Sequence, residues 1–527
     1  MNKTRRMFAP LGFLAILSLL RTGVVAGQQS AADSAWALGD FASARRNYEQ
    51  VLVNDPNSVR ANYRLGILAS WDSRFDSALV LIHRARAVEP DDPDLHLQEA
   101  LILAWADRFD QAIIHYDSVI AAHPSRTDAL MGRAQTLAWA NRFHEADAAY
   151  ESIIARDPGN LDAATGRAQL AAWRGDLPAA IRQYETILAK DPRHVAALAG
   201  LGQVNLWQGH VVAAEGFARR AHETSPGDRA VRDLDVALRT ATRPQPELTL
   251  GWSNDSDHNT AWWQTVAASI FVADGFRAFG SAGALEVSDP VRNASRLSAE
   301  AGLSYGIGNL GITGALGIRH LSPDSGSGYA AGTFRVSSSY RLSSRAGVGV
   351  AFAHYSFDET ALLIDQHLRI DALDLSANLL LRPGLSVEGG AGQVWLSDHN
   401  SRVSGIVAVT QTIRRNFWAG AMARGLSYEF KGIGYFSPDR FTLFEARGGW
   451  SRAWHPWHAR VSGGLGVQQG ARGTRSQAEW HLEGRVGRNW TPFSAVEFFA
   501  GISTSAESST TGAFRYRTAG IVIRVGL

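Results

Sequence analysis

The sequence predicts an α + β chain of two structural parts: an N-terminal α-solenoid of six helical repeats and a C-terminal antiparallel transmembrane β-barrel of about sixteen strands. Three observations predict it. Small, aromatic and proline residues recur every 34 residues in the first half, apolar and polar residues alternate after about residue 247, and short turns alternate with longer polar loops to the C-terminus. We assign residues 1–26 to a cleaved signal peptide, 27–240 to the solenoid, 241–246 to a linker and 247–527 to the barrel.

The composition excludes several classes of protein. A length of 527 residues exceeds one ordinary core, and a formal net charge of +2 argues against nucleic-acid binding by phosphate neutralisation. The absence of cysteine excludes disulfides, thiolate metal sites and cysteine nucleophiles. No stretch in the body of the chain reaches the roughly 18 apolar residues of a membrane helix, so any membrane span must be built of strands.

The N-terminus has the pattern of a secretory signal. Lys3, Arg5 and Arg6 precede an apolar stretch over Phe8–Leu20, and small residues then lead to Ala26. The alternatives are a membrane anchor or an amphipathic first helix, but the apolar run is short and interrupted. We therefore expect cleavage after Ala26 and export from the cytoplasm.

The first half repeats with a period of 34 residues. Each repeat has an alanine twelve residues before its final proline, and most have a tyrosine eight residues before it; the prolines are Pro56, Pro90, Pro124, Pro158, Pro192 and Pro226. Alanine lets two helices approach closely, tyrosine fills the space beside it, and proline ends one helix while tolerating the first turn of the next. Since one hairpin cannot bury its apolar face alone, six hairpins stack, and residues 228–240 cap the last one. Over about residues 29–240 the pattern resembles the tetratricopeptide repeat.

A tryptophan column recurs with the same period, near the end of the first helix of each repeat: Trp71, Trp105, Trp139, Trp173 and Trp207. Helical spacing places amide and carboxylate groups on the same stripe: Gln135, Gln169, Gln203, Asp94, Asp128 and Asp162. In the repeat family that this half resembles, the stripe lines a concave groove. Indole faces flanked by polar groups suit the stacking and hydrogen bonding of a sugar chain. The alternative, which burial statistics favour, is that each indole packs against the adjacent repeat.

Helical periodicity ends after the linker. In Glu479–Val486 the charged residues occupy one face and the apolar residues the other, and Ile521 and Ile523 likewise face away from Arg524. This alternation, repeated to the C-terminus, is typical of a barrel with lipid outside and water inside.

The connections in this half alternate in length. Short turns are expected at residues 274–275, 308–309, 343–344, 383–384, 415–416, 456–457 and 492–493, and longer polar loops at 254–259, 289–293, 322–328, 358–361, 397–401, 431–440, 469–476 and 507–511. Seven turns and eight loops join sixteen strands. A soluble β-sandwich would explain the alternation but not this rhythm. With residue 245 in the periplasm, every short turn lies on the periplasmic side, as outer-membrane barrels require, so we expect a barrel surrounded by outer-membrane lipid and a periplasmic N-terminal domain.

Six charged residues of the predicted strands are expected to face the lumen: Arg335, Arg341, Arg369, Glu445, Arg447 and Arg485. Charges on a pore wall select among solutes. The alternative is that these residues are paired, solvated wall residues with no preferred cargo.

The sequence contains no recognisable catalytic arrangement. The histidines at 354, 367, 399, 455 and 458 are scattered without metal-ligand spacing, and no Gly-x-Ser-x-Gly stands at a strand-to-helix turn. We therefore expect no enzymatic activity, no metal and no cofactor.

A signal peptide, a repeat array and a C-terminal barrel, in that order, resemble bacterial exopolysaccharide exporters of the cellulose and poly-N-acetylglucosamine type, and also the YaiO-like outer-membrane family. Residues Gly434–Phe441 (GYFSPDRF) are similar to a Tyr-Phe-Ser-Pro stretch near the end of cellulose-exporter barrels. The resemblance implies export of a polysaccharide through a water-filled pore, with the solenoid guiding the polymer or holding periplasmic or inner-membrane secretion or synthase proteins. Two other interpretations stay open: a membrane-anchored scaffold for periplasmic proteins, and a general porin-like channel.

Overall fold

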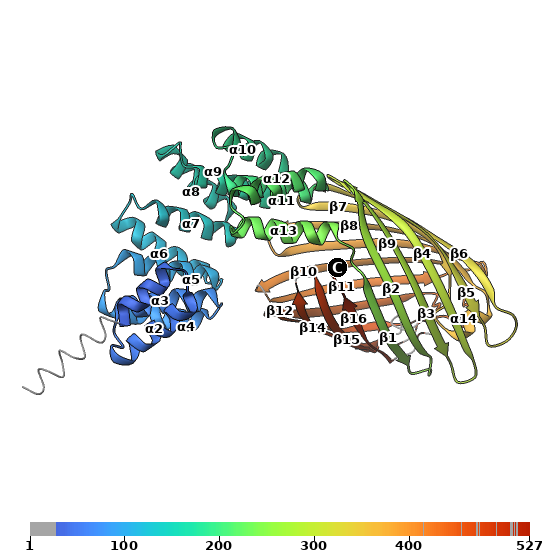
Figure 1. The fold of residues 1–527 in the computed structure, drawn as a ribbon. Coiled ribbons are helices and arrows are strands. Elements are labelled where there is room, and N and C mark those ends of the chain that lie inside the picture. The colour runs from blue at the N-terminus through green and yellow to red at the C-terminus, as the bar shows by residue number, and fades with distance from the viewer. Residues whose placement is uncertain are drawn as a thin grey trace, which may run out of the picture. The chain divides into compact units, whose positions relative to one another are not determined.

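The computed structural model describes residues 28–414, 416–454, 456–470, 473, 475–491, 493–505, 510, 512 and 515–526. The chain divides into two compact units, residues 1–174 and 175–527. The first holds helices α2–α9, and the second holds helices α10–α13 together with a β-barrel (Figure 1). The predicted signal peptide, residues 1–26, lies outside the described residues. No described helix has both the length and the apolar character needed to cross a membrane.

Paired helices follow the 34-residue period, which confirms the predicted repeats. They are α2 (Phe41–Asn54), α3 (Val59–Trp71), α4 (Phe75–Val88), α5 (Pro93–Trp105), α6 (Phe109–Ala122), α7 (Thr127–Trp139), α8 (Phe143–Arg156), α9 (Leu161–Trp173), α10 (Leu177–Lys190), α11 (Val195–Trp207), α12 (Val211–Thr224) and α13 (Arg229–Thr242). Residues 28–37 are also helical and complete the first repeat. The last helix, α13, begins after the capping side chain of Asp228 and ends two residues beyond the expected boundary at 240.

The recurring residues pack as their spacing predicts. Ala112, Ala146 and Ala180 are fully buried, so paired helices touch at these positions. The ring of Tyr150 lies against Gly166, where an added Cβ would stand 2.5 Å from it; Tyr116 and Gly132, and Tyr184 and Gly200, meet in the same way. The turn within each pair takes a left-handed residue, at Gly39, Ser73, Asp107, Asn141, Gly175 and Gly209, which ends the first helix sharply.

One carboxylate is buried between repeats of the first unit. Glu99 on α5 is 4% exposed; its Oε1 lies 2.8 Å from His83 Nε2 and 3.6 Å from His115 Nε2, and Arg86 donates to its Oε2. Burial raises the pKa of Glu99, but His115, His83 and Arg86 outweigh it and hold that pKa below its usual range. Burial lowers the pKa of His115.

The second half forms a closed antiparallel barrel of sixteen strands, as predicted, in which each strand pairs with its neighbours in sequence and β1 pairs with β16. The strands are β1 (Glu247–Asp255), β2 (Thr260–Ala273), β3 (Phe276–Ser288), β4 (Asn293–Ile307), β5 (Leu310–Ser322), β6 (Tyr329–Ser343), β7 (Ala346–Ser356), β8 (Arg369–Arg382), β9 (Leu385–Leu396), β10 (Ser401–Arg414), β11 (Phe417–Tyr428), β12 (Phe441–Trp454), β13 (Trp457–Gln469), β14 (Gln477–Thr491), β15 (Ser494–Ser503) and β16 (Tyr516–Arg524). Closure leaves no unpaired sheet edge, which is the condition for strands to cross a bilayer.

The two ends of the barrel differ. The strand ends that short connections join lie at the end that meets α11–α13, and the strand ends that longer connections join lie at the opposite end (Figure 1). Backbone bonds join the last repeat to the short-turn end: Gly275 N donates to Gly209 O at 3.0 Å, and Gly308 N donates to Gln208 O at 3.1 Å. The alternation of short and long connections agrees with the rhythm read from the sequence.

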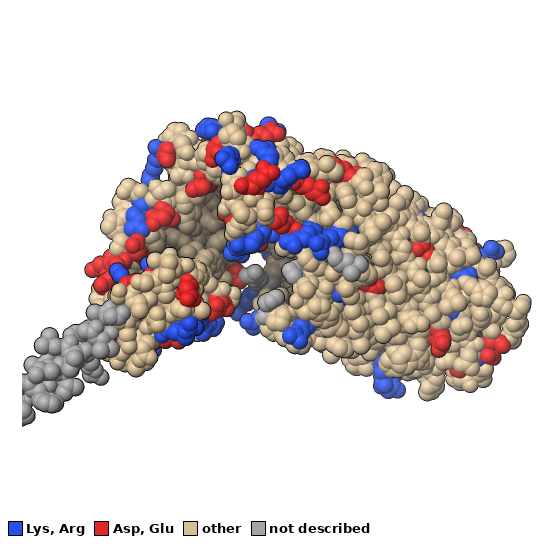
Figure 2. Space-filling view, in the orientation of Figure 1, with Lys and Arg blue, Asp and Glu red and all other residues tan. Residues whose placement is uncertain are grey.

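The outer face of the barrel is apolar. Exposed apolar residues stand at alternate positions of many strands, and Leu250, Val266, Leu297, Leu316 and Leu465 are 39–72% exposed. Figure 2 shows few charged side chains on the barrel face in view, whereas charges are frequent over the helices. An apolar band around a closed barrel is the surface that lipid covers.

Candidate functional site: the barrel lumen and its two ends

The inner face of the wall is polar. Ser253, Ala261, Leu285, Tyr355 and Ile370 line a cavity inside the barrel, so residues two apart from them along each strand share the inner face. By this register the wall is rich in hydroxyl and amide side chains: Ser298, Thr313, Thr333, Ser337, Ser339, Ser376, Asn378, Ser386, Ser404 and Thr410. Such groups can replace the water around a hydroxylated solute, because each can both donate and accept hydrogen bonds.

Five of the six predicted lumen charges lie on this inner face. Arg335 pairs with Glu300 at 2.5 Å, and Arg485 pairs with Glu497 at 3.0 Å. Arg341 lines the hollow at the short-turn end, and Glu445 and Arg447 share the inner face of β12. Their part in selectivity stays a prediction.

The placement of Arg369 in the lumen is wrong. Arg369 lies one residue from Ile370, whose side chain lines the inner cavity, so register puts Arg369 on the opposite face with Asp371. The residue begins β8 directly after the loop 357–368, where it is exposed. The sequence could not place it, because one residue of uncertainty in where a strand begins reverses its faces.

A hollow of about 810 Å³ opens at the short-turn end, between the last repeat and the wall. Trp207, the final residue of α11, lines it and is 46% exposed. Inner-face residues also line it, among them Arg341, Asn378 and Glu388. An indole therefore stands at the point where the solenoid meets the polar wall.

The other members of the tryptophan column are also partly exposed. Trp71, Trp139 and Trp173 are 36–50% exposed, and Trp105 is half-buried. Each ends the first helix of its repeat, as the spacing predicts. Trp71 stacks on Trp36 of the preceding repeat, with ring centroids 5.8 Å apart. The column thus combines contact with a neighbouring repeat and free indole surface, and its ligand-binding role stays a prediction.

The polar groups predicted beside the column have partners within the solenoid. Gln135 accepts a hydrogen bond from Tyr150 at 3.1 Å, and Gln169 and Gln203 are half-buried on the same stripe. Arg126 pairs with Asp94 at 2.8 Å and with Asp128 at 2.6 Å, which ties two repeats together. Asp162 is exposed. Asp94 thus contributes to the contacts between repeats, and a ligand-binding role for the three aspartates stays a prediction.

At the long-loop end a segment between β7 and β8 folds into the lumen. We call residues 357–368 the plug; it contains the short helix α14 (Ala361–Asp365). Leu363 packs on the wall formed by β8–β12, in a buried cluster with Ile370 and Leu443. Its neighbour Ile364 packs on β3–β5, with Leu285 and other buried residues. Adjacent residues of the plug thus contact opposite walls, and the plug spans the lumen.

Asp358 holds the plug to the wall by charge. Its side chain is 3% exposed, and its two oxygens lie 2.7 Å from Arg296 Nη1 and 2.8 Å from Arg319 Nη1. Both arginines belong to the inner face of β4 and β5. Ser356 donates a further bond to Asp358 at 2.6 Å. A buried carboxylate with this many charged partners fixes the start of the plug in one position.

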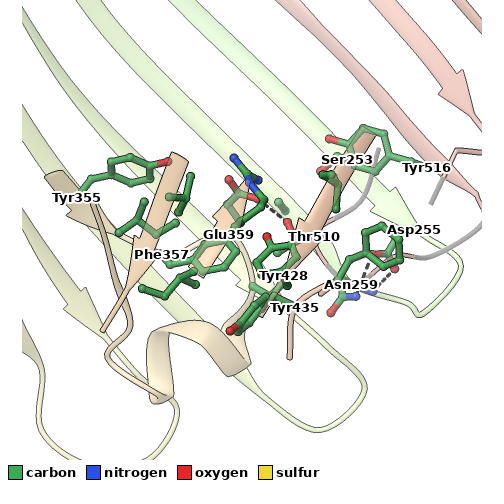
Figure 3. Close-up of a pocket in the computed structure, with 18 of the residues that line it drawn as sticks. Ser253, Asp255, Asn259, Tyr355, Phe357, Glu359, Tyr428, Tyr435, Thr510 and Tyr516 are labelled. Carbon is green, nitrogen blue, oxygen red and sulfur yellow. Dashed lines mark hydrogen bonds between the residues drawn. The ribbon is translucent and has the colours of Figure 1, made fainter. Parts of the chain in front are cut away.

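Beside the plug lies a cavity of about 350 Å³. Aromatic side chains from several parts of the barrel point into it, including Tyr355, Phe357, Tyr428, Tyr435 and Tyr516 (Figure 3). They mix ring faces with hydroxyl groups, so the cavity offers both stacking and hydrogen bonding.

The segment that resembles the exporter motif belongs to this closure. Tyr435 is 5% exposed; its hydroxyl donates to Asp398 at 2.7 Å and accepts from Asn400 at 2.8 Å. Burial and the bond to Asp398 raise the pKa of Tyr435 well above its ordinary value, so the ring stays neutral. Phe436 N donates to Thr510 O at 2.7 Å, and Thr510 bonds Glu359 of the plug. Tyr435 and Phe436 after β11, and Thr510 after β15, thus contact one another or the plug.

The sequence pattern does not predict the plug and indicates only a polar loop at residues 358–361. The signal was the apolar run Leu362–Ile364 directly after it, which an exposed loop would not carry, but nothing in the spacing showed that this run turns inward. The pairing of Asp358 with two wall arginines joins residues far apart in sequence and left no local pattern.

Fold and site together define a class: a tetratricopeptide-repeat solenoid followed by a closed β-barrel of the outer-membrane type, with a plugged lumen. Models of the tetratricopeptide repeat match residues 35–102, 97–161, 131–181 and 165–229. No curated protein is significantly similar to the chain in sequence.

Among solved structures, a bacterial polysaccharide outer-membrane secretin is 12% identical to this chain, with 55% of this chain and 99% of that one covered and a TM-score of 0.44. CdiB from Acinetobacter baumannii is 12% identical, with 54% and 60% covered and a TM-score of 0.37. A tetratricopeptide repeat protein from Parabacteroides merdae is 15% identical, with 41% and 85% covered and a TM-score of 0.35. The class assignment rests on the repeats and strands of this chain.

Proposed function

We propose that the protein is a gated outer-membrane channel that guides an extracellular polysaccharide, with its solenoid in the periplasm. The observation that carries the proposal is Trp207 at the rim of a hollow that continues onto a hydroxyl-rich inner wall. A sugar ring stacks on an indole through its C–H face while its hydroxyls bond to serine, threonine and asparagine. The aromatic cavity beside the plug offers a second surface of the same chemistry.

The apolar outer band supports a location in the outer membrane. Water in contact with this band would be unfavourable, whereas lipid covers it favourably. Short turns on the solenoid side support a periplasmic solenoid, since barrels of this kind place short turns there. The plug supports gating: a sixteen-stranded barrel is wide enough for an aqueous channel, and the plug packs on two sets of its strands at the long-loop end.

Titration of the full-length chain in detergent micelles tests the proposal. The probes are soluble oligosaccharides of β-1,4-linked glucose and of β-1,6-linked N-acetylglucosamine, and heat release is the readout. We expect Trp207→Ala to weaken binding by about 1 kcal/mol, or about fivefold in Kd, through loss of one stacking surface. Trp262→Ala is the matched control, because this indole is 59% exposed on the outer face. If Trp207→Ala and Trp262→Ala bind the oligosaccharides with equal affinity, the proposed sugar path at Trp207 is contradicted.

A scaffold is the second candidate, and the plug favours it: a barrel that never opens serves only as an anchor for a solenoid that binds periplasmic proteins. Removal of the plug residues 359–367 separates the two. Steady ion conductance of the shortened chain in planar bilayers, blocked by a binding oligosaccharide, supports the channel. A shortened chain that folds but neither conducts nor binds sugar supports the scaffold.

A further inference from the structure

Three potential metal ligands meet on the inner wall near the long-loop end. Nδ1 of His481 lies 3.2 Å from an oxygen of Glu445 and 3.6 Å from an oxygen of Glu479. One ligand atom from each of the three residues lies within 4.8 Å of the other two. Glu445 comes from β12, and Glu479 and His481 come from β14, so the group bridges two strands that are not neighbours.

The strand between them is shaped to let these side chains meet. On β13, Gly466 is the register partner of both Glu445 and Glu479, and Gly464 is the partner of His481. A Cβ at Gly464 would stand 2.4 Å from the Glu445 carboxyl and 2.7 Å from the His481 ring. Any larger residue there would push the two ligands apart. The glycines thus create one shared space above β13.

The cluster sets two buried carboxylates against a single imidazole. Glu445 and Glu479 are 5% and 2% exposed, and one oxygen of each is buried without a hydrogen-bond partner. Among the described residues, the ion pairs of both carboxylates are with His481 alone. A nearby histidine–carboxylate pair differs: Glu497 faces His458 at 3.3 Å but also holds Arg485 at 3.0 Å. Two buried carboxylates with open oxygen positions call for a positive charge between them.

We propose that Glu445, Glu479 and His481 bind a divalent transition-metal ion of the Zn²⁺ class on the lumen wall. One imidazole and two carboxylates are ligands of this class, whereas Ca²⁺ and Mg²⁺ take oxygen ligands alone. Ligand atoms on a tetrahedral ion with bonds of about 2.0–2.2 Å stand about 3.3–3.6 Å apart, close to the two separations at His481. Three protein ligands leave a further position for water or for a group of the cargo.

The site would cross-link β12 to β14 over β13. A bound ion would hold β12 and β14 at a fixed separation near the long-loop end of the barrel. The sequence prediction of no metal rested on histidine spacing, which does not detect ligands that barrel register brings together from β12 and β14.

The test uses the full-length chain without an affinity tag, in detergent, stripped with chelator and dialysed against ZnCl₂. We expect one Zn²⁺ per chain to be lost in Glu479→Gln, in His481→Ala and in Gly464→Ala, which keeps every ligand but fills the shared space. His458→Ala and Gly484→Ala are the matched controls, since Glu497 already has its arginine and a Cβ at Gly484 meets nothing within 4 Å. Metal is measured by elemental analysis, and retained folding by heat-modifiable migration on gels.

Replacement of Zn²⁺ by Co²⁺ provides the second readout. We expect visible ligand-field absorption in the wild type and the controls, reduced at least tenfold in the three site variants. Stoichiometry and absorption that stay the same in the site variants would overturn the proposal, because the bound metal would then lie elsewhere. A wild-type chain that binds no Zn²⁺ after stripping would overturn it equally.

Discussion

Replacement of Asp358 by alanine is expected to loosen the plug. The carboxylate bonds Arg296 and Arg319 at 2.7 and 2.8 Å, and the two arginine side chains are themselves only 21% and 23% exposed. Breaking a fully buried pair costs about 3–5 kcal/mol; because the lumen hydrates these arginines in part, we expect about 2–3 kcal/mol here. At about 1.4 kcal/mol per factor of ten, the ratio of open to closed plug rises about 30- to 150-fold.

Single-channel recording in planar bilayers measures this ratio directly as open probability. Asp324→Ala is the matched control, since Asp324 is an exposed acid of another long loop at the same end. We expect Asp324→Ala to behave as the wild type, Asp358→Ala to open more often, and removal of residues 359–367 to conduct continuously. If the shortened chain conducts but Asp358→Ala opens no more often than the wild type, the charge contacts do not hold the plug. That result would refute the reasoning.

Three further predictions concern stability. Gly166→Ala places a methyl 2.5 Å from the ring of Tyr150 and should cost the solenoid about 1–3 kcal/mol, seen as a lower thermal midpoint of helical circular dichroism. Leu316→Arg puts a charge on the lipid-facing band and should cost the barrel about 2–4 kcal/mol, measured by urea unfolding in lipid. Acidification should destabilise the solenoid. Because the pKa values of Glu99 and His115 are lowered in the folded state, both groups bind protons more readily when the chain is unfolded, and the free energy of unfolding falls as the pH drops from about 7 to about 4. Glu99→Gln should reduce this pH dependence.

The first two predictions have matched control substitutions. Gly216→Ala meets nothing within 4 Å and should leave the thermal midpoint unchanged. Ser337→Arg faces the lumen and should be tolerated where Leu316→Arg is not. A helical signal that is equally stable at pH 4 and pH 7 would contradict the role given to Glu99.

The repeats and the strand count follow from the sequence because they depend on local patterns. An alanine, tyrosine and proline column fixes where helices meet and end, and alternation with turn residues fixes where strands begin and reverse. Arg335 and Arg485 could be placed on the inner face for the same reason. Arg369 could not, since it stands at a strand boundary where a single residue reverses the side.

Contacts between distant strands were beyond prediction. Asp358 meets two arginines 62 and 39 residues earlier in the chain, and Glu445 meets His481 across a third strand. Neither arrangement leaves a spacing in the sequence, because both depend on barrel closure and register. The strands of the barrel can therefore be predicted from the sequence, whereas the contacts inside its lumen require the structure.

The free energy that holds the plug closed sets the binding free energy that a cargo needs to open the channel. Leu363 and Ile364 are fully buried on opposite walls, and exposing both costs about 3–6 kcal/mol at about 1.5–3 kcal/mol for each side chain. With about 2–3 kcal/mol for the contacts of Asp358, these contacts together contribute about 5–9 kcal/mol to the closed state. To offset them and bring the channel to half open, a ligand must bind the open state more tightly than the closed state by about the same amount. One stacked sugar does not supply this, but a chain that occupies both the hollow at Trp207 and the aromatic cavity can, so we expect long oligosaccharides to open the wild-type channel and short ones only to open Asp358→Ala.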